Sequence, residues 1–382
     1  MVDTDARREP RGTGIYDRLG VRTIVNARGA TTAVGGTLMP PEVLAAMAEA
    51  ARAFVVLDEL NAAVGRRIAA ATGAEAGYVT AGSAAGMALA VAACIAGSDP
   101  ARIRRLPHSE GLANEVVIHR AHRIAYDQMF RVGGGRLVEI GLAGATEPWE
   151  LEAAIGARTA AVAYVDSPSA GRGALPFPVV VETAHRRGVP VLVDAASTLP
   201  PVAHLRRWVA QGADLVIYSG GKGIRGPQDS GFLAGRADLI AAAAANGNPR
   251  SGVGRGMKVS KEAMVGLAVA LDRFLAHDHD ADFAAHRAQA EALVEGLAGR
   301  DDLRCELVAD EEAYPAPVVV VAPRGAGWAP GAVRDALAAG TPSIHCNAAH
   351  GRLEFHTHCL VPGDEETIVA RLREVLDAPA AR

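Results

Sequence analysis

Only three lysines are available for amine chemistry in this chain. Of its 39 lysines and arginines, the lysines are Lys222, Lys258 and Lys261. Lys258 and Lys261 stand at the start of a long helical pattern, where a lysine usually faces solvent or pairs with a carboxylate. Lys222 instead follows an apolar run and lies in the segment Tyr218-Ser219-Gly220-Gly221-Lys222-Gly223. Ligands bind beyond the carboxyl ends of strands in open α/β sheets, so Lys222 is the candidate nucleophile.

An acidic residue ends the strand pattern before this one. Asp194 closes the apolar run Pro190–Asp194. An acid in this place can pair with the pyridinium nitrogen of pyridoxal phosphate (PLP) and keep the ring protonated, so that the ring accepts electrons from a carbanion. Ser197, on the same turn, is placed to reach the 3′-oxygen of the cofactor. The alternative is that Asp194 only caps its own turn.

Small residues between an earlier strand and an apolar helix form a candidate phosphate site. The segment Thr80–Gly86 reads TAGSAAG. Small residues at a helix N-terminus expose backbone N–H groups, which bind phosphate together with the helix dipole. Such turns are common in α/β proteins, so the order along the chain matters here: the phosphate turn, then Asp194, then Lys222.

This order resembles that of fold-type I PLP enzymes, and four stretches resemble one family among them. That family is the selenocysteine-synthase-like family, which includes bacterial seryl-tRNA selenium transferase and D-glucosaminate-6-phosphate ammonia-lyase. The resemblance covers roughly residues 15 to 275 and is strongest around Lys222. The stretches that carry it are Val25–Gly29, Leu57–Leu60, Tyr78–Gly86 and Tyr218–Gly231.

The resemblance implies a role for each matching residue. It makes Lys222 the Schiff-base lysine and Asp194 the partner of the ring nitrogen. It also implies a histidine stacked on the ring, His122, for which His119 is the competing choice. The remaining implied contacts are with the cofactor phosphate, at Ser83, Ala84 and Ser219.

Arginines are the candidates for binding a carboxylate or phosphate of the substrate, because the guanidinium fork matches oxyanions. Arg255 is the first choice because it lies among the glycines of Gly252–Gly256. The other candidates are Arg28, Arg225 and Arg352.

The expected activity is that of a PLP-dependent lyase. It would eliminate ammonia from a small amino acid that bears a β-leaving group, for example a hydroxylated or phosphorylated one, and release a 2-oxo acid. A racemase, an aldolase or an aminotransferase on the same scaffold is the alternative, because a fold does not determine a reaction. A catalytically silent PLP-binding protein is disfavoured by the presence of both Lys222 and Asp194.

Composition disfavours a nucleic-acid substrate. The formal net charge is −4 and the pI is about 6.3, which is unlike the basic surface of a nucleic-acid binder. By resemblance, a selenium transferase carries an additional N-terminal region for tRNA. The family-like segment of this chain begins within about fifteen residues of the start, so we expect no such region. A selenium transferase acting on tRNA is therefore the less favoured reading.

The sequence is typical of a cytoplasmic protein. Its four cysteines have no paired spacing, and we expect no signal peptide and no membrane segment. The expected partner is a small-molecule amino acid. By resemblance, we also expect a homodimer or a higher homo-oligomer.

Apolar runs that alternate with helix-length segments predict a mostly parallel sheet. Six runs are the expected strands: 77–80, 115–119, 137–140, 160–165, 189–194 and 215–219. The resemblance implies the aspartate-aminotransferase-like fold type I, with a seven-stranded sheet and a small C-terminal α+β domain. The expected parts are a flexible tail (1–13), an N-terminal segment (14–60), a large PLP-binding domain (61–257), and a long helix with the small domain (258–382).

Four histidines near the C-terminus raise the question of a metal. His356 and His358 lie two residues apart on a predicted strand and would face the same side. A zinc site needs further ligands and an ordered outer shell. We expect no metal, and packing or substrate contact for these two residues and for His345 and His350.

Overall fold

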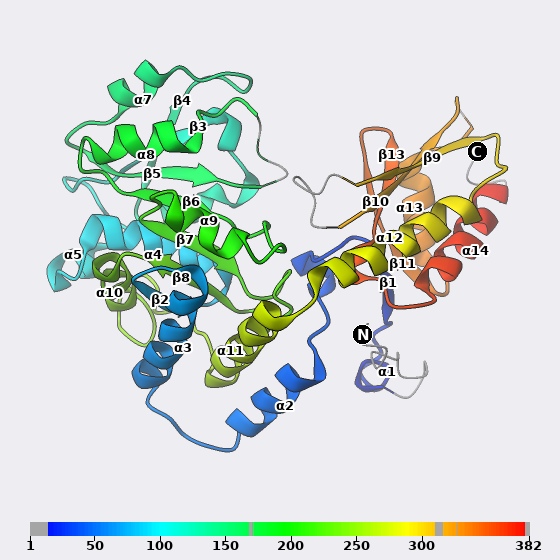
Figure 1. Ribbon diagram of the computed structural model, residues 1–382, viewed down its shortest axis with the longest axis horizontal. Coiled ribbons are helices and arrows are strands. Elements are labelled where there is room, and N and C mark those ends of the chain that lie inside the picture. The colour runs from blue at the N-terminus through cyan, green and yellow to red at the C-terminus, as the bar shows by residue number, and fades with distance from the viewer. Residues whose placement is uncertain (1–13, 168–169, 171, 310–315, 326, 379–382) are drawn as a thin grey trace. The chain divides into compact units, whose positions relative to one another are not determined.

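The computed structural model describes residues 14–167, 170, 172–309, 316–325 and 327–378 (Figure 1). The expected flexible tail, residues 1–13, lies outside these ranges. The chain forms two compact units. The large unit runs from Met39 to His277, and the small unit combines the residues up to Leu38 with those from Asp278 onward.

The large unit is built on a seven-stranded sheet with the order β2-β8-β7-β6-β5-β3-β4. Strand β8 pairs antiparallel with β2 and β7, and the other pairs are parallel. Six strands therefore end at one edge of the sheet, as the fold class predicts. The bounds are β2 Ala76–Thr80, β3 Glu115–His119, β4 Arg136–Ile140, β5 Thr159–Val165, β6 Val191–Asp194, β7 Leu215–Ser219 and β8 Gly231–Gly235.

Helices cover both faces of this sheet, which explains why its strands are apolar on both sides. Along β6, Val191 and Val193 pack into one core while Leu192 packs into the other. The first core lies against α3 (Leu57–Thr72), α8 (Phe177–His185), α9 (His204–Ala210) and α11 (Lys261–Ala276). The second lies against α4 (Gly82–Ala96), α6 (Gln128–Val132) and α10 (Ala237–Asn246).

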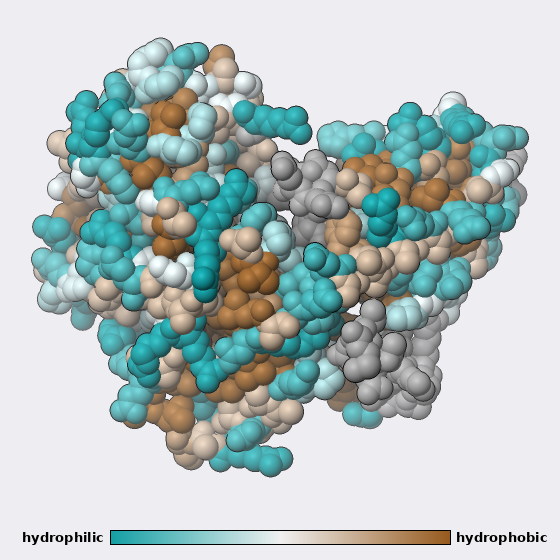
Figure 2. All heavy atoms as spheres, viewed as in Figure 1, coloured by the Kyte–Doolittle hydropathy of each residue, from teal (hydrophilic) through white to brown (hydrophobic). Residues whose placement is uncertain are grey.

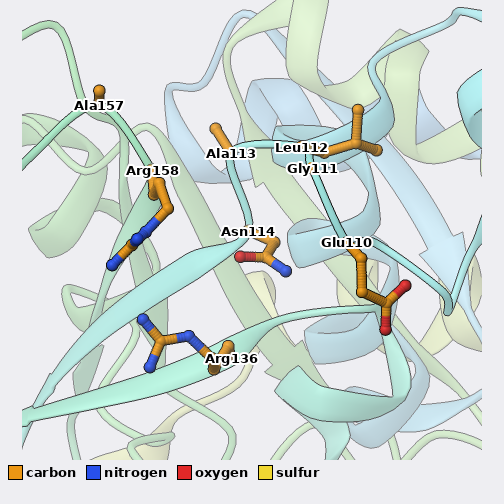
Figure 3. Close-up of a pocket in the computed structure, with 8 residues that line it drawn as sticks. All are labelled: Glu110, Gly111, Leu112, Ala113, Asn114, Arg136, Ala157 and Arg158. Carbon is orange, nitrogen blue, oxygen red and sulfur yellow. The ribbon is translucent and has the colours of Figure 1, made fainter.

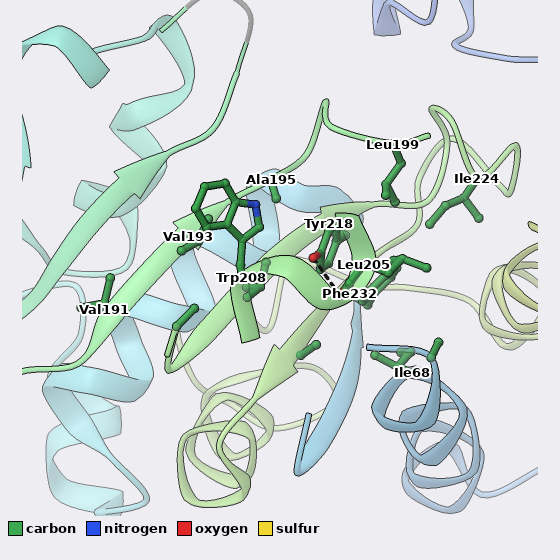
Figure 4. Close-up of a cluster of buried hydrophobic side chains, with 14 of the residues drawn as sticks. Ile68, Val191, Val193, Ala195, Leu199, Leu205, Trp208, Tyr218, Ile224 and Phe232 are labelled. Atoms are coloured by element: carbon green, nitrogen blue, oxygen red, sulfur yellow. Dashed lines mark hydrogen bonds between the residues drawn. The ribbon is translucent and has the colours of Figure 1, made fainter. Parts of the chain in front are cut away.

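Figure 4 shows part of the first core around Trp208, Tyr218 and Phe232. The Tyr218 hydroxyl donates to the backbone oxygens of His204 and Leu205, at 3.0 and 3.1 Å, and so ties β7 to α9.

Figure 2 shows hydrophilic side chains over much of the visible face, with apolar residues exposed among them. The remaining helices of the large unit are α2 (Pro41–Ala50), α5 (Pro100–Arg105) and α7 (Pro148–Ala154).

The division into units differs from the expected domain boundaries. The long helix α11 packs against α2 and α3, and it therefore belongs to the large unit. The expected N-terminal segment is divided at Leu38, because β1 (Ile24–Asn26) pairs in parallel with β11 (Ser343–His345) in the small unit. Contacts between distant parts of the chain decide both assignments.

The small unit contains a four-stranded antiparallel sheet with the order β12-β13-β10-β9. Its strands are β9 Leu303–Val308, β10 Val318–Pro323, β12 Asn347–Ala349 and β13 Arg352–His356. Its helices are α1 Ile15–Arg18, α12 His279–Gly296, α13 Pro330–Ala339 and α14 Asp364–Asp377. Within the described part of the chain, neither unit has a helix with the length and apolarity needed to cross a membrane.

Candidate active site

Lys222 lies in a tight loop directly after β7. A Cβ added to Gly221 would lie 2.5 Å from Gln228 Cα, and one added to Gly223 would lie 2.2 Å from the Leu199 backbone oxygen. Real Cβ contacts are not this short. The backbone on either side of Lys222 can therefore pack this closely only because both flanking residues are glycine. The glycines that mark the segment in the sequence thus place the lysine.

The Lys222 amine sits in a partly buried, polar position. It donates a hydrogen bond of 2.8 Å to the Ser197 hydroxyl. Burial lowers the pKa of Lys222, and the charge of Asp194 offsets part of that shift. A lowered pKa favours the neutral amine, which is the nucleophilic form.

The other two lysines have ordinary surroundings. Lys261 donates to the Ala50 backbone oxygen at 2.6 Å and pairs with Glu262, while Lys258 is exposed. Neither lies at a strand end.

Asp194 is a buried acid at the end of β6, with 6% of its surface exposed. Its Oδ1 accepts a hydrogen bond of 3.1 Å from the Ala196 backbone N–H, so it does cap its turn. Burial raises the pKa of Asp194, and the Ala196 hydrogen bond and Lys222 oppose this shift. Among the described residues, none donates a hydrogen bond to the second carboxylate oxygen, which leaves Oδ2 for a cationic ligand atom.

The first turn of α4, where the sequence predicts a phosphate site, has backbone N–H groups without partners inside the helix. The helix begins at Gly82, whose φ is +75°, and no side chain in the described part of the chain caps its N-terminus. Ser83 and Ala84 are half-buried in that turn. Their N–H groups belong to those that have no partner within the helix and can bind an anion.

Strand β8 brings this turn next to β7. A Cβ on Gly231 would lie 2.7 Å from the Ser83 backbone nitrogen, and Gly231 is the register partner of Ser219. Ser219 and the first turn of α4 therefore approach each other through the start of β8. The six expected strands did not include this strand.

Two buried histidines lie at the carboxyl end of β3, with ring centroids 5.1 Å apart. The Val165 backbone N–H donates to His122 Nδ1 at 3.2 Å, which assigns the ring proton of neutral His122 to Nε2. Both ring nitrogens of His119 are buried, and neither has a hydrogen-bond partner among the described residues. Burial lowers the pKa of His122 to about 3 and that of His119 to about 4, so both rings are neutral.

Asp166 is a further acid at this edge that the sequence motifs did not single out. It follows β5, and its backbone N–H donates to the Asp194 backbone oxygen at 2.9 Å. The Trp208 indole N–H donates to its Oδ2 at 3.1 Å. Burial raises the pKa of Asp166, while Arg207 and His204 oppose that shift. The sequence signal that could have identified Asp166 is its place directly after β5, an apolar strand that is parallel to β6 and β7.

The candidate arginines lie in different places. Arg225 follows the lysine on its loop, has a φ of +59°, and its backbone N–H donates to the Lys222 oxygen at 2.8 Å. Arg255 is exposed, and its Nη1 donates to Asn248 Oδ1 at 3.2 Å. Arg28 belongs to the small unit, as does Arg352, which pairs with Glu354.

The C-terminal histidines also lie in the small unit. His358 Nε2 accepts a hydrogen bond of 3.1 Å from the Ala30 backbone N–H. Its ring meets that of His356 edge to face, with centroids 5.9 Å apart. No group of three or more His, Cys, Asp or Glu side chains in the described ranges is arranged to hold a metal ion.

A surface pocket of about 580 Å³ lies at the opposite edge of the sheet (Figure 3). Arg136 begins β4, and Arg158 precedes β5. Both form ion pairs with Glu115 at the start of β3, so a carboxylate of the protein itself already partners these two arginines. The pocket is therefore separate from the edge that carries Lys222. Its lining residues are Glu110, Gly111, Leu112, Ala113, Asn114, Arg136, Ala157 and Arg158.

The groups around Lys222 fit PLP. The uncapped turn of α4 suits the phosphate, Oδ2 of Asp194 suits a protonated ring nitrogen, and the desolvated amine of Lys222 suits a carbonyl carbon. Neutral His122 suits packing against an aromatic ring. When bound, PLP would act as an electron sink for a carbanion beside the amine.

Comparisons with known proteins agree with this geometry. The family model for L-seryl-tRNA selenium transferase matches residues 24–285. A 5′-C-glycyluridine monooxygenase-decarboxylase from Streptomyces sp is 38% identical, over 97% of this chain and 94% of its own. The D-glucosaminate-6-phosphate ammonia lyase of Salmonella typhimurium is 36% identical, over 96% of this chain and 99% of its own.

Solved structures show the same fold. A structure of D-glucosaminate-6-phosphate ammonia-lyase superposes with a TM-score of 0.85 at 36% identity, covering 95% of this chain and 98% of that one. A serine palmitoyltransferase from S. paucimobilis with bound PLP has a TM-score of 0.59 at 14% identity, covering 92% and 87%, which shows the fold alone. The chain therefore belongs to the selenocysteine-synthase-like family of fold-type I enzymes, whose family model is that of L-seryl-tRNA selenium transferase.

Proposed function

We propose that this protein is a PLP-dependent lyase that acts on a small amino acid with a leaving group on its β-carbon. Loss of that group gives an enamine, and hydrolysis of the enamine releases ammonia and a 2-oxo acid. The observation that carries the proposal is the desolvated amine of Lys222, held at the sheet edge beside the buried acid Asp194. The match to an ammonia lyase over nearly the whole length of both chains supports this reaction class.

Each residue at the edge has a proposed task. Lys222 would hold PLP through its amine, and the neutral amine would accept the α-proton of the substrate. Asp194 holds the ring nitrogen in its protonated form, and Ser197 orients the lysine amine through their hydrogen bond. Ser83, Ala84 and Ser219 hold the phosphate, and neutral His122 packs on the ring.

The substrate contacts are also part of the proposal. Arg225 lies on the lysine loop, and Arg255 and Arg28 are the other candidates for an oxyanion of the substrate. We further propose a small amino acid rather than tRNA as the substrate. A matching L-seryl-tRNA(Sec) selenium transferase from Rhizobium meliloti aligns with only 48% of this chain.

A second candidate reaction is oxidative decarboxylation. The relative from Streptomyces sp, named a monooxygenase-decarboxylase, is as similar to this chain as the ammonia lyase is. Lys222 and Asp194 would serve that reaction equally well, because both reactions use a carbanion beside the amine.

We propose that the protein works in the cytoplasm as a homo-oligomer. Its four cysteines are free, as expected in a reducing compartment. Exposed apolar side chains around the α2–α3 connection, namely Leu44, Phe54, Val55 and Val56, are consistent with a subunit contact.

Parallel assays under nitrogen and in air, each with and without an added 2-oxo acid, separate the candidate reactions. The holoenzyme would be screened with serine, threonine, their phosphorylated forms and amino-sugar acids, in both configurations. Ammonia and 2-oxo acid in equal amounts support the lyase. A need for oxygen with carbon dioxide release supports the decarboxylase, and dependence on an acceptor acid supports an aminotransferase. Lys222→Ala should abolish turnover, whereas Lys258→Ala, the matched control, should keep it.

A further inference from the structure

Arg28 is a half-buried arginine without a carboxylate partner. Most arginines of the small unit pair with an acid, as Arg304 does with Glu306 and Arg352 with Glu354. Among the described residues, no acid lies within ion-pair distance of Arg28. A half-buried charge without a counter-ion is unfavourable unless a ligand supplies one.

The chain around Arg28 is held in a defined conformation. The Arg28 backbone N–H donates to Asn26 Oδ1 at 3.0 Å, and Asn26 Nδ2 donates to the Gly29 oxygen at 3.1 Å. The Arg28 Nε donates to Asn347 Oδ1 at 3.3 Å. This contact orients the guanidinium while its two terminal nitrogens remain available for the fork that binds oxyanions.

A histidine lies beside this arginine. In the parallel pair of β1 and β11, Asn26 is the register partner of His345, and the Ala27 backbone N–H donates to the His345 oxygen at 2.8 Å. Arg28, His345 and Asn347 therefore meet where these two strands end. All three are half-buried, and each can donate a hydrogen bond.

The surrounding charge is positive. Burial and the positive charges of Arg28 and Arg22 all lower the pKa of His345. No acid among the described residues contributes an opposing shift. The charge of Arg28 also reaches the buried thiol of Cys346, where it opposes the rise in pKa that burial causes. Glu354 lies opposite Asn347 in the pairing of β12 with β13. Its carboxylate accepts hydrogen bonds from Arg352 and so is already paired.

We propose that Arg28, His345 and Asn347 form a binding site for a small oxyanion, either a phosphate or a carboxylate group. The guanidinium of Arg28 supplies the charge, and the His345 ring and the Asn347 amide supply neutral donors. The site lies wholly within the small unit, and its binding of an anion can be measured without the lyase reaction.

The test measures anion binding to the PLP-loaded full-length protein, with inorganic phosphate and acetate as separate probes. Calorimetry gives the affinity, and NMR titration of the His345 ring reports on the site itself. Phosphate or acetate should bind and move the His345 signal. The probe that binds more tightly distinguishes a phosphate site from a carboxylate site. Arg28→Gln should weaken binding by about tenfold to 100-fold, the scale of a lost charge-assisted contact.

Two further variants make the result decisive. Asn347→Asp has nearly the same shape but places a carboxylate against Arg28, so it should abolish anion binding while the protein stays folded. Arg304→Gln removes an exposed charge of the same unit and should bind the probe like the wild type. Unchanged binding in Asn347→Asp, equal loss in Arg304→Gln, or no response of the His345 signal to either probe would overturn the proposal.

Discussion

The amine of Lys222 and the hydroxyl of Ser197 are joined by a hydrogen bond of 2.8 Å. Ser197 follows Asp194 on the turn after β6, whereas Lys222 follows the neighbouring strand β7. One turn thus supplies both an acceptor for the lysine and a buried acid. The sequence predicts Ser197 as a contact of the 3′-oxygen of the cofactor, and a hydroxyl at hydrogen-bond distance from the amine is well placed for both contacts.

The first prediction concerns the attachment of the cofactor. Purified protein should be yellow, and borohydride should fix PLP on Lys222, because this lysine alone of the three is desolvated beside a buried acid. Peptide mass spectrometry identifies the modified residue. An adduct on Lys258 or Lys261 would show that the site assignment is wrong, whatever the reaction is.

The second prediction concerns Asp194, the acid proposed to pair with the ring nitrogen of the cofactor. Asp194→Asn should retain bound PLP but lose turnover on the order of 100-fold, the usual scale for removing one group that stabilises developing charge. Absorbance and steady-state kinetics measure the two properties. Asp238→Asn is a matched control, because Asp238 is an exposed acid paired with Arg236. Near-normal turnover in Asp194→Asn would mean that Asp194 does not partner the ring.

The third prediction concerns the phosphate cup. In Gly231→Ala the new Cβ would lie 2.6 Å from the Gly82 carbonyl carbon and 2.7 Å from the Ser83 nitrogen, so the first turn of α4 must shift. We expect at least a tenfold weaker affinity for PLP and a stability loss of about 1–3 kcal/mol, as for overpacking elsewhere. Cofactor titration and thermal unfolding measure these effects.

Gly156→Ala is the control for that substitution, since a Cβ at Gly156 would meet nothing within 4 Å. It should leave the affinity for PLP unchanged. Wild-type affinity in Gly231→Ala would place the cofactor phosphate away from α4.

The fourth prediction concerns the pH dependence of stability through Asp166. Burial raises the pKa of Asp166 above its ordinary value of 3.8, so the folded protein keeps this proton at a higher pH than the unfolded chain does. Between the unfolded and folded pKa values the native state binds more protons, and the free energy of unfolding therefore falls as the pH rises. Asp166→Asn removes this dependence.

The stability of Asp166→Asn relative to the wild type should consequently increase with pH above 3.8 and then level off. Urea unfolding of both proteins at several pH values measures the difference, in which the titrating groups that do not interact with Asp166 cancel. A difference that is constant with pH, or that decreases as the pH rises, would show that burial does not raise the pKa of Asp166.

The sequence by itself determined the family and the fold class, and it singled out the residues that are proposed to form the site. Lys222, Asp194 and the turn at Ser83 each lie directly beyond a strand pattern, and local residue types specify such positions. Strand ends in a parallel sheet share one edge, so three local patterns sufficed to predict one site. The comparisons confirm the family and the fold.

Other relationships were decided only by the tertiary structure. Asp166 meets Asp194 because β5 neighbours β6, and Gly231 meets Ser83 because the reversed strand β8 lies between β2 and β7. Arg28 and Asn347 are far apart in the sequence, and they contact each other because β1 pairs with β11. Local patterns specify where a strand ends but not which strand lies beside it. That choice depends on the burial of whole faces, so contacts between distant segments follow from packing.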